Sequence, residues 1–190
     1  MKAHFRKPLL IIALATFSLL IVFRFIQDHK AKPVHTKEVL GSTSTGLPAH
    51  LKIPSINVDA NIEYVDVTQK GTMDTPVNIM DVGWFKLGPR PGEIGSAVIA
   101  GHFDGKNCKP AVFFNLYKLK KGDRLYIEDD KGMAITFVVQ GSHAYDPGYA
   151  EEVFSSNDSA HLNLITCDGV WNGVQKSYTK RLVVFADITD

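Results

Sequence analysis

From residue 51 onward, the chain consists of short runs of alternating apolar and polar residues separated by turn signals. Alternating runs cover 51–58, 62–67, 124–128 and 133–140, and more continuously apolar runs cover 96–100, 162–167 and 181–188. A period of two is typical of half-buried strands, and helical periodicity is almost absent. The turn at 129–132 between two runs predicts a hairpin. We therefore expect an all-β domain, either a closed barrel or a sandwich.

The first fifty residues have a different character. Residues 1–7 carry three basic side chains, and residues 8–23 are apolar apart from Thr16 and Ser18. The charged head of Arg24 can reach the interface, so that 8–26 is long enough to span a bilayer. Basic residues before such a segment place the N-terminus in the cytoplasm and the remainder outside. The alternative is a cleaved signal peptide, but the small residues of a cleavage site do not follow the apolar run.

These patterns predict four parts. Residues 1–7 form a cytoplasmic basic N-terminus, 8–26 an uncleaved transmembrane signal anchor, 27–50 a flexible extracellular linker and 51–190 the folded domain. The expected location is therefore the plasma membrane, crossed once, with the folded domain extracellular.

Charge and cysteine content exclude two classes of function. The net charge is +1, but residues 1–50 hold seven Lys/Arg against two Asp/Glu, and the remainder holds fourteen against eighteen. A mildly acidic domain without a basic stripe is not expected to bind nucleic acid. Cys108 and Cys167 lack metal-ligand spacing, and no matched carboxylates suggest a calcium site, so we expect neither a metal nor a cofactor.

Cys167 ends one of the apolar runs, just before the turn pair Asp168-Gly169. On a strand, residues 162, 164 and 166 share one face, and Asn163, Ile165 and Cys167 share the other. A thiol at the end of a strand is held by the sheet and reaches a cleft between loops. Two other interpretations stay open, a buried apolar cysteine and a disulfide with Cys108.

A nucleophilic cysteine needs a group that takes its proton or stabilises the thiolate. His102 is the histidine that follows an apolar strand directly, whereas His143 and His161 lie in polar stretches and are expected to be solvated. If the strands before His102 and Cys167 are parallel neighbours, both side chains emerge at the same rim. Arg181 begins the last strand and offers a cationic donor for an oxyanion.

The chain resembles the sortase family over nearly all of residues 51–188. The resemblance rests on motifs in the family's order: Leu51-Lys52-Ile53-Pro54, Met73-Asp74-Thr75-Pro76, Val82-Gly83-Trp84-Phe85, Ala100-Gly101-His102, Phe114-Asn115-Leu116, Leu119-Lys120-Lys121-Gly122-Asp123, Leu164-Ile165-Thr166-Cys167 and Lys180-Arg181-Leu182. The segments 88–92 and 100–104 are most similar to class F sortases, or to class D or E.

This resemblance implies a closed eight-stranded sortase β-barrel with short helices, and a catalytic set of His102, Cys167 and Arg181. Thr166 matches the family's threonine before the nucleophile and is implied as a supporting, substrate-binding residue. The implied reaction cleaves a Leu-Pro-x-Thr-Gly-like sorting signal between Thr and Gly through a thioester. The implied partners are secreted proteins with a C-terminal sorting signal, and the amine of a lipid-linked cell-wall precursor or of a pilin subunit, on a Gram-positive-type cell.

Two alternatives use the same barrel. A hydrolase would use the same three residues with water as the acceptor. A non-catalytic, membrane-anchored binding domain would keep the barrel and tolerate loss of Cys167.

Overall fold

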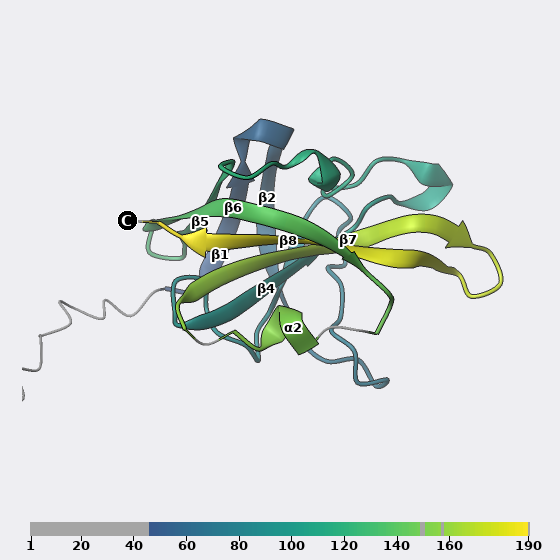
Figure 1. Cartoon of the computed structure of the whole chain (residues 1–190), viewed down its shortest axis with the longest axis horizontal. Coiled ribbons are helices and arrows are strands. Elements are labelled where there is room, and N and C mark those ends of the chain that lie inside the picture. The colour runs from purple at the N-terminus through teal and green to yellow at the C-terminus, as the bar shows by residue number, and fades with distance from the viewer. Residues whose placement is uncertain (1–45, 149–150, 157, 190) are drawn as a thin grey trace, which may run out of the picture. The chain divides into compact units, whose positions relative to one another are not determined.

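The computed structural model describes residues 46–148, 151–156 and 158–189. Their strands close into one barrel in the order β1-β2-β3-β4-β7-β8-β6-β5 (Figure 1), which confirms the expected eight-stranded all-β barrel. The strands are β1 (Pro48–Ile53), β2 (Val58–Val65), β3 (Val82–Phe85), β4 (Gly95–Gly101), β5 (Arg124–Asp129), β6 (Ala134–Tyr145), β7 (Ala160–Asn172) and β8 (Ser177–Ile188). The connections hold the 3-10 turns η1 (Pro54–Ile56), η2 (Lys106–Cys108) and η3 (Leu116–Lys118), and the short helix α2 (Glu151–Phe154).

Two strand pairs of the barrel are parallel, β2 with β3 and β4 with β7. Parallel neighbours need a long crossover, and the chain between β4 and β7 contains β5 and β6, which complete the opposite wall. The expected parallel pairing of the strands that precede His102 and end near Cys167 is therefore confirmed.

The barrel wall is apolar on both faces near β4 and β7. Inside, Leu51, Ile99, Phe137 and Leu164 are fully buried. Outside, a second cluster joins Val98, Tyr145 and Val183 of the barrel to Val153 of α2. Strands covered on both faces have nearly continuous apolar sequence, which explains why residues 96–100 and 162–167 do not alternate strictly.

The chain enters the barrel beside the β5–β6 hairpin. The Asp129 carboxylate accepts hydrogen bonds from the backbone N–H groups of Gly46, Lys131 and Met133 at 2.8, 2.9 and 2.8 Å. The bond from Met133 contributes most to lowering the pKa of Asp129. Because Pro48 pairs with Asp129, β1 starts at Pro48, and the last three residues of the expected linker belong to a strand.

The N-terminal predictions lie outside the described residues. The expected segments 1–7 and 8–26, and most of 27–50, fall before residue 46. Within the part of the chain that the structure describes, no helix has the length and apolar content needed to cross a bilayer.

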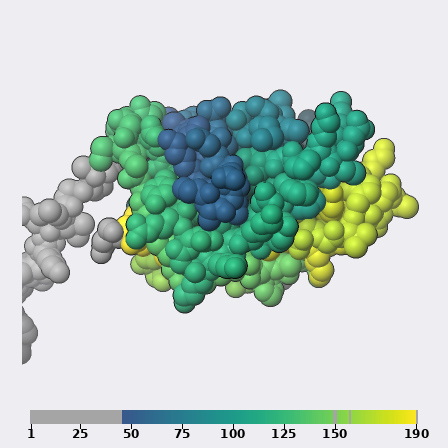
Figure 2. Space-filling view, turned by 90° about the horizontal axis from the view of Figure 1, so that it is seen from above, coloured from purple at the N-terminus to yellow at the C-terminus, as the bar shows by residue number. Residues whose placement is uncertain are grey.

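The structure differs from expectation after Cys167, where a strand hairpin replaces the expected loop. β7 continues to Asn172 and pairs with β8, so Cys167 is not the last residue of its strand. The register shifts between Asp168 and Trp171, at Gly169, whose φ of +81° suits glycine. In Figures 1 and 2 this yellow hairpin projects beyond the barrel, next to teal residues that follow β4.

Candidate functional site

Cys167 lies on the outer face of β7, as the alternation predicts. Leu162, Leu164 and Thr166 are buried inside the barrel, whereas Ile165 and Cys167 are half-buried on the outer face. Cys167 and Cys108 are both free thiols, and Cys108 is exposed in η2. The structure therefore presents Cys167 as a partly accessible thiol.

His102 directly follows β4, the parallel neighbour of β7. Ala100 is the Cα partner of Ile165, so continuing this register places His102 beside Cys167. The Nε2 atom of His102 lies 2.9 Å from the carbonyl oxygen of Pro76. A carbonyl only accepts, so Nε2 carries a proton, and Nδ1 is the nitrogen that gains or loses one.

Thr166 joins the two strands that carry these side chains. Its hydroxyl donates a 2.8 Å hydrogen bond to the carbonyl of Gly101, the residue before His102. Thr166 is 3% exposed and does not line the groove described below. The structure thus places Thr166 between β4 and β7, and its role in substrate binding stays a prediction.

Arg181 lies directly across from Cys167. The two residues are Cα partners in the antiparallel β7–β8 pair, which puts their side chains on the same face. The guanidinium donates to the carbonyls of Tyr178 and Lys180 at 3.1 and 2.8 Å and to the Ser177 hydroxyl at 3.1 Å. These bonds use three of its five N–H donors and hold the charge near the thiol.

The surroundings of Cys167 favour the neutral thiol at rest. Burial raises the pKa of the Cys167 thiol, the positive charge of Arg181 lowers it in part, and the negative charge of Asp104 raises it again. Because the thiolate is the nucleophile, the site needs a base or a bound substrate to form it.

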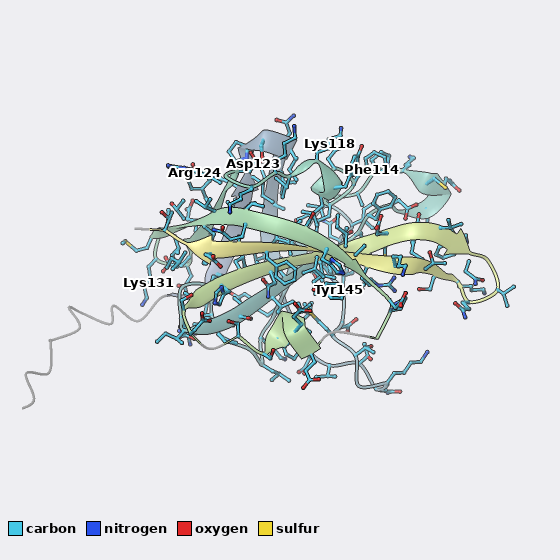
Figure 3. All side chains as sticks on the ribbon, in the orientation of Figure 1. Phe114, Lys118, Asp123, Arg124, Lys131 and Tyr145 are labelled. Atoms are coloured by element: carbon cyan, nitrogen blue, oxygen red, sulfur yellow. The ribbon has the colours of Figure 1, made fainter. Side chains whose placement is uncertain are left out.

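A groove of about 680 Å³ opens beside Cys167 and Arg181. Its floor is mostly apolar, with Phe85, Phe154 and Ile165 among the lining side chains, and its rim includes residues 71–75 and 147–148. Tyr145, labelled next to α2 in Figure 3, donates a 3.0 Å hydrogen bond to Glu152 of that helix. The groove suits an extended peptide with apolar side chains whose reacting bond lies at the thiol.

Two residues near the thiol were not predicted from the sequence. Tyr178 donates a 2.6 Å hydrogen bond to Asp104, which raises the pKa of Tyr178 to about 12. Asp104 follows His102 by two residues, and this proximity in sequence was the one signal available. Tyr178 is separated from Asp104 by 74 positions, so that only the fold brings the pair together.

A family model described as the sortase domain matches residues 51–189. A comparison with curated protein sequences found no match. Among solved structures, sortase C-1 from Actinomyces oris is 25% identical, with a TM-score of 0.61, and the match covers 75% of this chain and 73% of that chain. Sortase C from Clostridium perfringens is 26% identical, with a TM-score of 0.57 and coverage of 77% and 72%.

The fold is also shared with sortase A from Corynebacterium diphtheriae, which is 24% identical with a TM-score of 0.61. That match covers 77% of this chain and 62% of the relative. The family match extends over nearly the whole described barrel and includes His102, Cys167 and Arg181. The chain therefore belongs to the sortase family of cysteine transpeptidases.

Proposed function

We propose that this sortase cleaves a Leu-Pro-x-Thr-Gly-like sorting signal between Thr and Gly and transfers the protein to an amine. The observation that carries this proposal is the pairing of Cys167 with Arg181, beside His102, at the end of an apolar groove. The groove floor of Phe85, Phe154 and Ile165 suits the leucine and proline of such a signal.

In the first half-reaction, the Cys167 thiol passes its proton to His102, and the sulfur attacks the carbonyl carbon of the threonine. The negative charge of the oxyanion develops next to Cys167, which faces Arg181 across the β7–β8 pair. Arg181 stabilises this charge with its remaining N–H donors. His102 gives a proton to the departing glycine amine. The peptide C–N bond breaks and a thioester to Cys167 forms.

In the second half-reaction, an amine attacks the thioester and His102 accepts its proton. The new amide bond joins the sorted protein to a lipid-linked cell-wall precursor or to a pilin subunit. With water in place of the amine, the same site would hydrolyse the signal, so omitting the amine from the assay separates transfer from hydrolysis.

Activity of active-site variants of the full-length chain tests these roles. Cys167→Ala should abolish both transfer and hydrolysis, because it removes the sulfur that forms the thioester. His102→Ala should lower kcat/KM by about 10²–10⁴-fold and Arg181→Ala by about 10²–10³-fold. Residual turnover by Cys167→Ala, or undiminished turnover by the other two variants, would contradict the assignment.

We further propose that residues 8–26 anchor the enzyme in the plasma membrane with the barrel outside a Gram-positive-type cell. This proposal is supported by the sequence, in which the basic residues of segment 1–7 precede the apolar run 8–23. A membrane-impermeant maleimide should label the exposed Cys108 on intact cells. Labelling only after lysis would contradict this location.

A further inference from the structure

Asp104 lies beside the nucleophile on the side away from the apolar groove. Along β7, the groove lies toward Ile165, whereas Tyr178, the hydrogen-bond partner of Asp104, pairs with Trp171 beyond Cys167. Neither Asp104 nor Tyr178 lines the groove. If the groove holds the signal up to its threonine, the Asp104 side is where the glycine departs and the acceptor arrives.

Further aromatic rings lie around Tyr178, the hydrogen-bond partner of this carboxylate. The Phe103 ring lies 5.6 Å from that of Tyr178 and 5.0 Å from that of Phe114, and the Trp171 ring lies 5.3 Å from Tyr178. Figure 3 shows Phe114 next to the segment that carries η2. Aromatic faces attract cations and pack well against alkyl chains, so the rings and the carboxylate together suit an alkylammonium group.

Asp104 forms no ion pair in the part of the chain that the structure describes. Across residues 46–148, 151–156 and 158–189, the ion pairs involve other carboxylates, and the hydrogen bond to Asp104 comes from a neutral tyrosine. The charge also opposes formation of the Cys167 thiolate. Asp104 is half-buried and disfavours the reactive thiolate, and a role in binding a cationic ligand best explains its position beside Cys167.

We propose that Asp104 binds the ammonium group of the acceptor amine, with Phe103 and Tyr178 contacting its alkyl chain. This inference rests on the proposed transpeptidation and specifies its second substrate as a primary alkylamine that arrives as a cation. Near neutral pH such amines are protonated, so a carboxylate concentrates and orients them beside the thioester.

In the transfer step, the bound ammonium group first gives one proton to His102, and His102 passes this proton to solvent. The nitrogen of the resulting amine then attacks the thioester carbonyl. The C–N bond forms and the C–S bond breaks. The nitrogen loses a second proton, again through His102, and this proton returns to the Cys167 sulfur.

The test measures how the shared thioester divides between transfer and hydrolysis. Full-length enzyme is given a Leu-Pro-x-Thr-Gly peptide with either propylamine, a cation near neutral pH, or hydroxylamine, which is neutral there. The ratio of the two products does not depend on the rate at which the thioester forms. Asp104→Asn keeps an oxygen for the Tyr178 hydroxyl but removes the charge, and should lower the propylamine ratio about ten-fold. The hydroxylamine ratio should change less than about two-fold.

A control variant separates the Asp104 charge from a general effect of removing a carboxylate. Asp146→Asn removes another carboxylate, one that pairs with Lys180 at 2.6 Å, and should leave the propylamine ratio within about two-fold. An equal loss with both acceptors in Asp104→Asn, no loss at all, or a matching loss in Asp146→Asn would overturn the proposal. Failure of the wild type to form a thioester would instead overturn the proposed reaction itself.

Discussion

At the scale of single residues, opposite charges on two sides of one thiol determine its reactivity. Arg181 faces Cys167 across the strand pair, and Asp104 approaches it from the loop after His102. Burial and Asp104 keep the sulfur protonated, while Arg181 favours the thiolate. A neutral thiol at rest is less prone to oxidation and alkylation than a thiolate.

The two charges should move the pKa of Cys167 in opposite directions when removed. Asp104→Asn should lower the pKa of the thiol, and Arg181→Gln should raise it, because the thiolate loses a repulsive neighbour in one case and an attractive one in the other. The rate of iodoacetamide alkylation as a function of pH measures this, with Cys108→Ser as the common background. A midpoint that is the same in both variants would show that neither charge acts on the sulfur.

At the scale of elements, the start of β7 is tied to the end of β8 by a charged cluster. The His161 ring pairs with Asp187 at 2.7 Å and with Asp158 at 2.9 Å. The expectation that His161 is solvated is therefore wrong. Asp187 reaches the ring once β7 and β8 have paired, and Asp158 reaches it from three residues earlier in the chain. Burial alone would lower the pKa of His161, but the hydrogen bonds to Asp158 and Asp187 outweigh it, and the pKa is raised.

This cluster should make stability depend on pH. The pKa of His161 is higher in the folded than in the unfolded protein. Its contribution to the free energy of unfolding is therefore complete below the unfolded pKa of about 6.5, and it is lost as the pH rises through the folded pKa. His161→Gln should therefore destabilise the protein more at about pH 5.5 than at about pH 8.5. Urea denaturation at both pH values measures the difference. The exposed His143→Gln serves as the control, and a loss for His161→Gln that is equal at both pH values would contradict the ion-pair account.

The same elements show what the sequence could and could not predict. Alternation in residues 162–167 correctly assigned the inward and outward faces of β7, because side-chain direction follows the strand period. It missed the continuation of β7 past Cys167. The pair Asp168-Gly169 is typical of a turn. In the structure, however, Trp171 and Tyr178 pair across β7 and β8, and Gly169 lies in a bulge of β7.

At the scale of the whole molecule, a barrel brings distant residues to one rim. The parallel neighbours β4 and β7 place His102 and Cys167 together, and β8 adds Arg181. These three positions could be selected from the sequence because apolar runs end at His102 and Cys167 and another begins at Arg181. The bond between Asp104 and Tyr178 could not, since it depends on how the loop after β4 packs against the hairpin (Figure 2). Assignment to class F, D or E stays a prediction.

The central claim is that Cys167 carries a thioester between a sorting signal and an amine. Intact-mass measurement of the full-length chain after mixing with a Leu-Pro-x-Thr-Gly peptide tests it most directly. We expect an adduct of the peptide up to its threonine on the wild type, absent from Cys167→Ala, retained by Cys108→Ser and discharged when a primary amine is added. An adduct that persists in Cys167→Ala, or a wild type that turns over the peptide without forming one, would contradict the account.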